Sequence, residues 1–489
     1  MAQQWDVIVC GAGTAGMPAA IFAARRGARV LLLEHADQVG GTLHLSSGEM
    51  SAAGTRLQQD RAIEDHPDRH FADVMRLTRG TADPHMVRIQ VDNAADTLHW
   101  LLDSGLELFN DMPVLMPQHE TYSVPRTYYG PKKGKAALDV IRPQLDAEIS
   151  KGGVTLRLAT EVLSLVQDGT GAVRGVRART NGGALETHYG SNVVLTTGGY
   201  GASETAYPEF SNGHKRIGWC YPYSQGTGLR MALTAGAVLH NQDKFLPMFG
   251  RVEDPGFWLD DREPFPNDPP RWYALCELTP ELRQPWEIYV NRRGERFVAE
   301  DSPTPDVREH LLLQQPDRMF AVVYDSRIAR ESPWLFMPEL TVAQVGKLWN
   351  VHPAFARGES LDAVAARLDI DTSGLRRAVG AYNEAVSAKR DPFGRRHLPL
   401  PISEPPFYAV RHFGTTVVGF AGIKVDRTFR VIDKSDRPIA NLFAAGEILG
   451  LGLLSGNCYV GGMSVTPAMT FGRLLGQSIL QWPMTSAAR

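Results

Sequence analysis

The sequence predicts an α/β fold in which the two ends of the chain build one domain and the middle builds another. Residues 6–34 follow the order strand, glycine turn, helix, strand, which is typical of a nucleotide-binding unit. Residues 442–447 end a second buried strand in another glycine turn. Between these two segments, proline becomes frequent from about residue 245. Because 489 residues are too many for one ordinary core, we expect two domains.

The first strand and turn predict a dinucleotide site. Residues 7–9 form a short apolar run suited to a buried parallel strand, and the pattern G-x-G-x-x-G follows at Gly11, Gly13 and Gly16. The first glycine permits the tight turn, the second lets the backbone approach a pyrophosphate, and the third lets helix and strand pack closely. Glu34 ends the next strand, where a carboxylate would bind the adenosine ribose and disfavour a 2′-phosphate.

Composition and charge exclude several classes of protein. The 51 basic and 54 acidic side chains give a formal charge of -3 without long runs of either sign, so nothing favours nucleic acid or an anionic membrane surface. The nucleotide motif begins within ten residues of Met1, and no apolar run reaches membrane-spanning length, so we expect a soluble cytoplasmic protein. The four cysteines are scattered and form no metal-binding or redox pattern, so no metal site is expected.

A glycine- and hydroxyl-rich loop follows Glu34. Residues 35–55 contain Gly40, Gly41 and Gly48 among serines and threonines, which favours close approach of the backbone to a ligand. A loop of this kind directly after the ribose-binding acid indicates a cofactor more extended than plain NAD.

Apolar periodicity predicts the scaffold elements of the N-terminal part. These are a helix over 84–106, a loop and then a helix over 119–141, alternating strands over 153–200, and a glycine-opened helix over 224–239.

The second domain is expected over residues 245–400. It should contain a hairpin over 287–300 with Arg293 and Gly294 at its turn, and helices around 341–388. The segment PPFYAV, residues 405–410, is interpreted as the return to the first domain. The predicted boundaries are therefore 1–244 and 401–489 for the nucleotide domain and 245–400 for the inserted domain.

The last hundred residues carry a second cofactor contact. A buried strand runs into Ala445, Gly446 and Glu447, so this backbone could meet the same ligand as the N-terminal motif. A final helix is predicted over 463–480. Its free N–H groups and positive dipole end could stabilise negative charge on a reduced flavin ring.

Taken together, these segments resemble the flavoprotein family of soluble fumarate reductases, the succinate dehydrogenase flavoprotein subunit and 3-ketosteroid dehydrogenases. The resemblance covers nearly the whole chain. It rests on CGAGTAG with Glu34, GGTLHLSSGEMSAAGT, NVVLTTGGYG, GTGLRMALTAGA, YVNRRGERFVAE, PPFYAV, and VDRTFRVIDKSDRPIANLFAAGEI through SVTPAMTFGRLLG.

The resemblance implies FAD in a doubly wound domain made of both chain ends, with an inserted α+β cap. It implies hydride transfer between flavin N5 and carbon, forming or removing a C=C bond beside an electron-withdrawing group. The histidine that attaches FAD in the succinate dehydrogenase branch falls at about Thr42, with His44 two places away, so non-covalent FAD is expected. The residues assigned to the cofactor are Gly11, Gly13, Thr14, Ala15, Gly16, Glu34, His35, Gly41, Thr42, Leu43, Ser47, Gly48, Val162, Thr197, Gly198, Gly446, Glu447, Ser464 and Val465.

Three departures from the fumarate reductases concern the substrate. The positions that resemble their carboxylate-binding arginine and histidine and their proton-donating arginine are Tyr459, Val418 and about Thr304. A dicarboxylate would lose charge-assisted pairing worth several kcal/mol per carboxylate. The active-site loop instead resembles that of the ketosteroid dehydrogenases, in which a tyrosine takes part in proton transfer.

Tyr459 is therefore the first candidate for proton transfer, with Tyr128 and Tyr129 as further candidates. Ionising an unperturbed phenol, pKa about 10, costs about 4 kcal/mol at neutral pH. A tyrosine acting as a base needs help, which Arg126 or His119 could give to Tyr128, whereas a neutral phenol can act as an acid without that cost.

The sequence thus predicts an FAD-dependent oxidoreductase that introduces or reduces a C=C bond alpha,beta to a carbonyl, on a cyclic or steroid-like ketone and with an unknown electron acceptor. One alternative is a reductase of an unsaturated carboxylic acid, in which Arg126, Lys132, Lys133 or Arg411 replaces the missing ligands. Another is a flavin electron-transfer protein without turnover.

Overall fold

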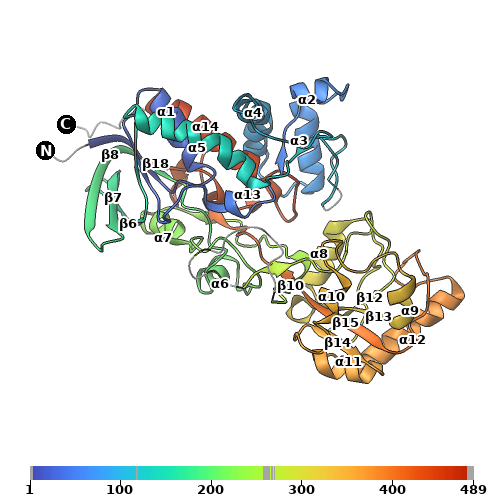
Figure 1. The fold of residues 1–489 in the computed structure, drawn as a ribbon. Coiled ribbons are helices and arrows are strands. Elements are labelled where there is room, and N and C mark those ends of the chain that lie inside the picture. Colours follow the sequence, from blue (N-terminus) through green and yellow to red (C-terminus); the bar gives the residue numbers. More distant parts are fainter. Residues whose placement is uncertain (1–3, 117–118, 257–264, 266–267, 269, 482–489) are drawn as a thin grey trace.

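The computed structural model describes residues 4–116, 119–256, 265, 268 and 270–481 and confirms the α/β fold. Its strands form two main sheets in separate parts of the molecule (Figure 1). One part is built from both ends of the chain. The other, which we call the cap, consists of the described residues between 248 and 415.

The larger sheet joins the N-terminal and C-terminal segments. Its strand order is β17-β18-β8-β1-β2-β5. In addition, β7 pairs with β8, and β6 pairs with β7. The strands are β1 (Gln4–Cys10), β2 (Val30–Leu33), β5 (Val154–Arg157), β6 (Thr160–Gln167), β7 (Val173–Thr180), β8 (Leu185–Leu195), β17 (Arg430–Ile432) and β18 (Pro438–Ala444). β1, β2, β5, β8 and β18 run parallel, and β6, β7 and β17 form antiparallel pairs.

The strand register brings the C-terminal segment beside the N-terminal motif. β8 pairs with β1 through Val193 opposite Ile8, and with β18 through Val193 opposite Leu442. β1 and β18 therefore flank the same strand, and both end at the same edge of the sheet. The predicted construction of the nucleotide domain from both chain ends follows from this pairing.

Helices cover this sheet and extend the first part (Figure 1). The predicted helices over 84–106, 119–141 and 463–480 correspond to α4, α5 and α14. The helices of this part are α1 (Gly16–Arg25), α2 (Arg56–Gln59), α3 (Pro67–Leu77), α4 (Pro84–Asp103), α5 (Gly134–Ser150), α6 (Ala206–Phe210), α7 (Thr227–Thr234), α13 (Gly452–Ser455) and α14 (Val465–Ser478). Two short pairs complete it: β3 (Met50–Ser51) with β4 (Thr127–Tyr128), and β9 (Leu239–His240) with β16 (Gly422–Ile423).

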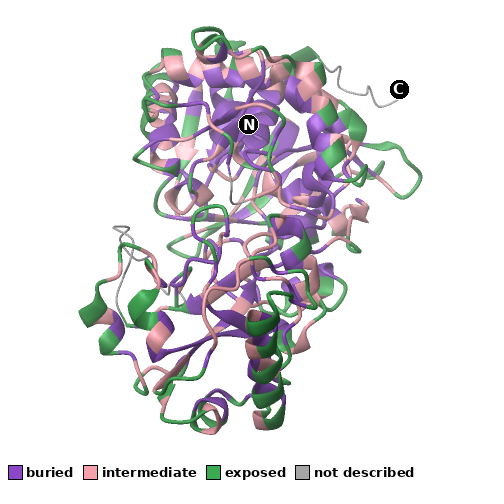
Figure 2. Ribbon diagram, turned by 90° about the vertical axis from the view of Figure 1, so that its right-hand side faces the viewer, coloured by how far each residue is buried: buried purple, intermediate pink, exposed green. Residues whose placement is uncertain are grey.

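The cap is a second sheet with its own helices and its own core. Its strands are β10 (Met248–Glu253), β11 (Trp272–Tyr273), β12 (Ile288–Asn291), β13 (Met319–Asp325), β14 (Phe355–Gly358) and β15 (Phe407–Thr415). Its helices are α8 (Pro305–Leu313), α9 (Ser326–Glu331), α10 (Val342–Gly346), α11 (Leu361–Leu368) and α12 (Thr372–Ala388). Figure 2 shows buried residues gathered inside each part and exposed residues on the outer helix faces.

The end of the cap differs from the predicted boundary at residue 400. Val410 of β15 pairs with Val322 of β13 and with Phe355 of β14, so β15 is a central strand of the cap sheet. Its alternating apolar residues do not reveal which sheet it joins, because that depends on contacts made across long stretches of sequence. The chain returns to the first part after Thr415.

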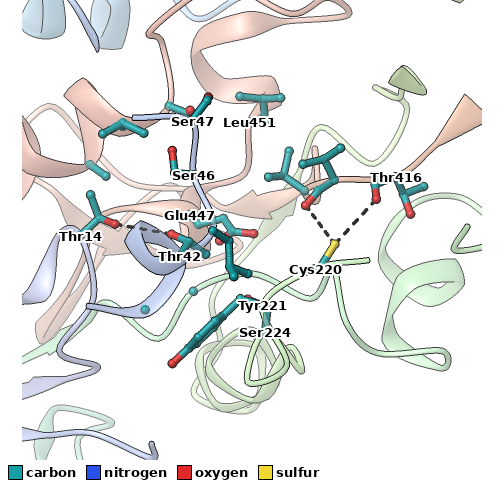
Figure 3. Close-up of a pocket in the computed structure, with 18 of the residues that line it drawn as sticks. Thr14, Thr42, Ser46, Ser47, Cys220, Tyr221, Ser224, Thr416, Glu447 and Leu451 are labelled. Atoms are coloured by element: carbon teal, nitrogen blue, oxygen red, sulfur yellow. Dashed lines mark hydrogen bonds between the residues drawn. The ribbon is translucent and has the colours of Figure 1, made fainter. Parts of the chain in front are cut away.

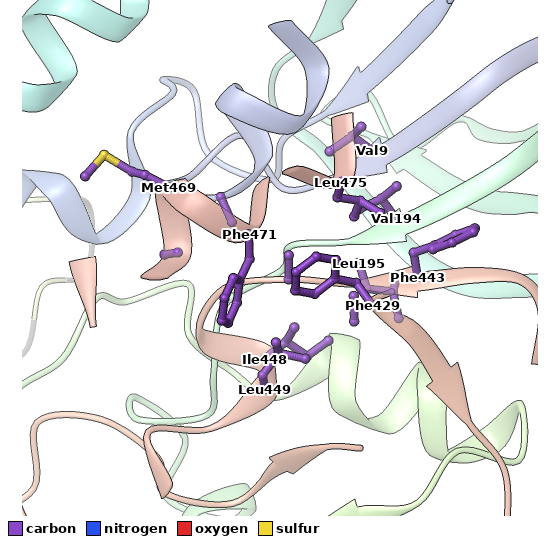
Figure 4. Packing of buried hydrophobic residues seen from close by; sticks show 14 of the residues in the cluster. Val9, Val194, Leu195, Phe429, Phe443, Ile448, Leu449, Met469, Phe471 and Leu475 are labelled. Atoms are coloured by element: carbon purple, nitrogen blue, oxygen red, sulfur yellow. The ribbon is translucent and has the colours of Figure 1, made fainter. Parts of the chain in front are cut away.

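The core of the first part lies between the sheet and α14. Figure 4 shows Val194, Leu195 and Phe443 of adjacent strands beside Phe471 and Leu475 of α14. All five side chains are 2% exposed or less. The last helix therefore contributes to the same hydrophobic core as the nucleotide-binding strands.

Two glycines let α14 pack closely on α1. A Cβ atom at Gly472 would lie 2.2 Å from the Ala15 carbonyl oxygen, and one at Gly476 would lie 2.5 Å from that of Ala19. A side chain at either position would have to push the two helix backbones apart.

We expect Gly472→Ala to lower the free energy of unfolding by about 1–3 kcal/mol, because relieving the overlap requires α1 and α14 to separate. Gly380→Ala is the matched control, because Gly380 is exposed in α12 and a Cβ atom there would meet nothing within 4 Å. The control should raise stability by about 0.5–1 kcal/mol. Thermal unfolding measures both, and equal stabilisation by both alanines would contradict the proposed close packing.

Candidate active site

One cavity of about 700 Å³ runs from the N-terminal glycine turn to the cap. At one end its wall includes Gly11 and Glu34, and at the other Arg251 and Glu309 of the cap. Tyr459, from the loop before α14, also lines it. The two parts of the molecule therefore enclose a single continuous space.

The glycine turn after β1 has the geometry that its sequence predicts. Gly11 has a φ of +104°, and a Cβ atom there would lie 2.4 Å from the Thr196 carbonyl oxygen. A Cβ atom at Gly16 would lie 1.8 Å from the Gly11 carbonyl oxygen, so Gly16 permits close packing and does not itself line the cavity. Gly13 lines the cavity, and the nearest atom to its Cβ position is the Gly41 Cα at 3.9 Å. A ligand can therefore reach the backbone at this point.

Glu34 lies at the predicted place directly after β2, but its carboxylate also holds the turn together. One oxygen accepts a hydrogen bond from the Ala12 N–H at 2.7 Å, and the other accepts one from the Ala36 N–H at 2.8 Å. Burial raises the pKa of Glu34, and these backbone donors oppose that rise. The His35 N–H is a third backbone donor to this carboxylate, and because the two oxygens together accept up to four hydrogen bonds, one position is left for a ribose hydroxyl.

The glycine-rich loop places two hydroxyls side by side in the cavity wall. Figure 3 shows Thr14 directed toward Thr42, with 3.5 Å between their hydroxyl oxygens. Leu43 and Gly48 lie behind the wall. A Cβ atom at Gly48 would lie 2.5 Å from the Lys133 carbonyl carbon, so this glycine lets the loop meet the start of α5.

Most of the residues predicted to hold the cofactor do line this cavity. These are Gly11, Gly13, Thr14, Ala15, Glu34, His35, Gly41, Thr42, Ser47, Val162, Thr197, Gly198, Gly446, Glu447, Ser464 and Val465. Gly16, Leu43 and Gly48 are the three that do not.

The second glycine turn touches the first. A Cβ atom at Gly446 would lie 2.9 Å from the Ala15 Cβ, so the backbones of the two motifs meet at this point. Glu447 follows and lines the cavity, and burial raises its pKa to about 7 against the opposing effect of a hydrogen bond from the Gly199 N–H. Ser464 and Val465, which begin α14, also line the cavity. The positive end of this helix therefore faces the ligand space.

Several cavity residues carry no recognisable sequence signal. Figure 3 shows Cys220, Tyr221 and Ser224 in the wall, and the Cys220 thiol donates a hydrogen bond to the Val417 carbonyl oxygen at 2.9 Å. These residues lie in an irregular segment between β8 and α7, where neither periodicity nor a known motif indicates a ligand contact.

Tyr459 is half-buried on the wall between the two parts. Its hydroxyl donates a hydrogen bond to the Leu246 carbonyl oxygen at 2.9 Å. The rings of His119 and Phe420 lie 5.6 and 5.8 Å from its ring. Burial raises the pKa of Tyr459 well above 10, so this side chain is a neutral phenol at physiological pH.

The other two predicted tyrosines do not line the cavity. Tyr128 is fully buried and its hydroxyl lies 2.6 Å from that of Thr55, while the ring of Tyr129 packs against Phe109. Arg126, considered as a helper for Tyr128, is buried in ion pairs with two aspartates, Asp65 at 2.8 Å and Asp73 at 3.1 Å. His119 lies beside Tyr459 instead.

The cap contributes a cation that was not among the predicted site residues. Arg251 of β10 lines the cavity, and burial lowers its pKa. Within the described part of the chain it has no carboxylate partner at ion-pair distance, and its recorded polar contact is a weak one, 3.6 Å to the Met248 sulfur. An arginine in this state can bind an anionic oxygen.

The cations considered as carboxylate ligands have different surroundings. Lys132 lies at the surface within 3.5 Å of both Glu107 and Asp139, and Arg411 lies over the Phe413 ring. Lys133 lines the cavity at its first-part side.

Comparison with known proteins settles the class of ligand. The profile of the FAD binding domain family matches residues 6–465, which is nearly the entire chain. The chain belongs to this family. Its cofactor is FAD, as the glycine turn, the second turn and the helix N-terminus predict. The cavity fits such a group, because both glycine turns open onto it and the Thr197 hydroxyl on its wall is buried without a hydrogen-bond partner among the residues that the structure describes.

Relatives in the family cover almost the whole chain. A probable fumarate reductase, Ifc3, of Shewanella frigidimarina is 26% identical over 475 residues, which are 97% of this chain and 74% of the relative. A urocanate reductase of Eggerthella lenta is 26% identical over 476 residues, which are 96% and 74%.

Solved structures show the same fold. The open conformation of a flavocytochrome c3 fumarate reductase has a TM-score of 0.73 at 25% identity, covering 98% of this chain and 78% of that chain. The 3-ketosteroid delta1-dehydrogenase of Sterolibacterium denitrificans has a TM-score of 0.76 at 20% identity, covering 98% and 99%. Across the described residues, no helix is long and apolar enough to cross a membrane.

We expect FAD to be held without a covalent bond, because Thr42 occupies the position that resembles the attachment histidine. Acid precipitation of the purified yellow protein should release all of the colour into the supernatant, where chromatography should identify it as FAD. Colour retained in the pellet would contradict this prediction, and Thr42→Ala and His44→Ala would then identify the attachment site.

Proposed function

We propose that the protein is an FAD-dependent oxidoreductase that introduces or reduces a C=C bond alpha,beta to a carbonyl. The observation that carries this proposal is the continuous cavity, which joins both FAD-binding turns to Tyr459 and Arg251. The names of the relatives, fumarate and urocanate reductase, support a reaction at a C=C bond.

The chain's own residues bind, orient and exchange protons. FAD, when bound, supplies the exchange of a hydride with a substrate carbon. The N-terminus of α14 points its free N–H groups at the ligand space, where they stabilise negative charge. The cap closes the other side and keeps water from the reacting atoms.

The composition of the wall favours a neutral ketone as the substrate. Two of the positions that resemble the dicarboxylate ligands of fumarate reductases, Tyr459 and Val418, line the cavity, and neither carries a charge. The third, Thr304, does not line it. Apolar side chains extend this surface into the cap: Met248, Phe249, Leu278, Leu282 and Met337. A cyclic or steroid-like hydrocarbon skeleton fits such a surface.

An unsaturated carboxylic acid is the second candidate, because of Arg251. Arg251 is half-buried, and among the described residues its guanidinium has no carboxylate partner, so it gains more from an anionic substrate than from a ketone. A flavin electron-transfer protein is less favoured, because such a protein has no use for an enclosed, largely apolar space beyond the cofactor.

Matched substrate pairs separate the two candidates. The enzyme is reduced anaerobically and then mixed with an enone or with the unsaturated acid of the same carbon skeleton. Faster reoxidation by the enone supports the ketone proposal, and faster reoxidation by the acid supports the second candidate. If neither reoxidises the FAD faster than buffer does, the proposed function is wrong.

The Arg251→Met variant also distinguishes a ketone substrate from an unsaturated acid. If an acid is the substrate, kcat/KM for the acid should fall by about 10- to 100-fold, since a charge-assisted hydrogen bond contributes about 1.5–3 kcal/mol. The value for the matched enone should change little. Arg357→Met, which alters an exposed cap arginine, is the control and should leave both values unchanged.

Tyr459→Phe tests proton transfer by the phenol. The substitution keeps the ring and removes the hydroxyl, so if the phenol transfers the proton, kcat should fall by about 10²- to 10⁴-fold while FAD content and melting temperature stay nearly constant. Tyr129→Phe removes a hydroxyl outside the cavity and should leave kcat unchanged. If Tyr459→Phe keeps most of its turnover, the phenol is only a packing residue.

A further inference from the structure

We propose that Glu309 is the protonated acid that supplies and recovers the substrate proton at the cap side of the cavity. The inference rests on the proposed function but concerns a residue that no motif of the sequence indicates. It follows from the position of Glu309, from its partners, and from a line of acidic side chains between the cavity and the surface.

Glu309 lies on the face of α8 that borders the cavity. Pro305, Arg308 and Glu309 all line the wall, and their spacing of three and four residues places them on one side of the helix. Residue Glu309 is 4% exposed, and its carboxyl accepts a hydrogen bond from the Phe249 N–H of β10. It is thus held at a fixed place between helix and strand.

The surroundings of this carboxyl favour its protonated form. Arg308 is the nearest cation along the helix, but its guanidinium donates to the Leu278 carbonyl oxygen and lies over the Phe249 ring, 5.5 Å from its centre. In the described part of the chain, no cation lies within ion-pair distance of Glu309. Burial raises the pKa of Glu309 well above its usual value; the neighbouring acids Asp306 and Glu120 add to this rise, and Arg308 and the hydrogen bond from Phe249 oppose it without cancelling it.

Tyr459 alone does not explain how the proton is supplied. Its hydroxyl hydrogen is engaged with the Leu246 carbonyl oxygen. A charge on the Glu309 carboxylate would raise the pKa of Tyr459 further and Arg251 lowers it, so both groups lie close enough to Tyr459 to act on its proton. These three groups border the same part of the cavity. A neutral carboxylic acid is intrinsically a stronger proton donor than a neutral phenol.

A route for the proton leads from Glu309 to the surface. Asp306, one helical turn earlier, pairs with Arg79 at 2.5 Å, and the Arg79 side chain is 64% exposed. His310 lies 3.3 Å from Asp306 on its other side. Glu120, from the first part, accepts a hydrogen bond from the Asp306 N–H, and burial raises its pKa too. The acids thus bridge from the buried cavity to solvent along the contact between the two parts.

The proposed step is balanced in the reductive direction. The π bond of the substrate breaks as one carbon gains a hydride, for which reduced FAD is the donor and becomes oxidised. The other carbon gains the proton of Glu309, whose O–H electron pair stays on the carboxylate. Water then reprotonates the carboxylate along Asp306 and Glu120. In the oxidative direction the carboxylate accepts the proton that leaves the carbon.

Glu309→Gln in the holoenzyme is the decisive variant. Glutamine has the shape and neutrality of a protonated glutamate, so a merely structural Glu309 would tolerate it. If Glu309 carries the proton, kcat should fall by about 10²- to 10⁴-fold with unchanged FAD content and melting temperature. Glu331→Gln, on the exposed surface of α9, should leave kcat unchanged. Turnover of Glu309→Gln close to that of the unaltered protein would overturn the proposal.

Infrared spectroscopy gives a readout that does not depend on turnover. The difference spectrum between the unaltered holoenzyme and Glu309→Gln at neutral pH should show the carbonyl stretching band of a protonated carboxylic acid, because subtraction removes the bands of other protonated carboxyls such as Glu447. Loss of this band as the pH rises should accompany loss of the reductive rate. If the two spectra are identical in this region, Glu309 is ionised and the proposal is wrong. If the band is present but no unsaturated carbonyl compound reoxidises the FAD, the proposed function is wrong while the protonated acid stands.

Discussion

Close backbone contact between segments from opposite ends of the chain is the constraint on which the site depends. Gly446 lies against Ala15 and Gly472 against the Ala15 carbonyl oxygen, while Gly11 lies against the Thr196 backbone directly after β8, the strand between β1 and β18. A side chain at any of these positions would separate strands or helices that must meet for both turns to face one cofactor. The cofactor site therefore forms only when residues more than four hundred positions apart have packed together, and its integrity is linked to the core around α14.

The cofactor side of the cavity could be predicted from the sequence where each feature depends on a few neighbouring residues. The turn at Gly11, the acid at Glu34 and the start of α14 each carry a signal within a few residues, because a tight turn, a strand end and a helix N-terminus have local requirements. The two bonds from Glu34 to Ala12 and Ala36 were not foreseen, because they depend on how the following loop folds back. These local signals indicate a dinucleotide cofactor, and the family resemblance that they carry together implies FAD.

The cap side of the cavity could not be predicted in the same way. From its sequence, β15 could equally be a strand of the first part, and only its pairing with β13 and β14 assigns it to the cap. Arg251 on β10 is one arginine among many in the sequence. Arg126 is a candidate helper for Tyr128 because the two share a loop, yet burial and the ion pairs with Asp65 and Asp73 give that loop a structural role. Proximity in sequence was the misleading guide there, and His119 of the same loop faces Tyr459 instead.

The charges at the cap side also bear on which substrate the protein can hold. Arg251 is cationic, whereas Tyr459 and Glu309 are neutral in the state that we propose, so the bordering groups leave an unbalanced positive charge. A ketone would gain negative charge at its oxygen as the hydride arrives, and Arg251 could stabilise that charge most strongly in the transition state. The carboxylate of an acid substrate is already charged in the ground state when it meets Arg251. More of the interaction would therefore lower KM, and less of it would raise kcat. The same residue can thus act in catalysis on one class of substrate and in affinity for the other, and comparing its effect on kcat with its effect on KM separates the two roles.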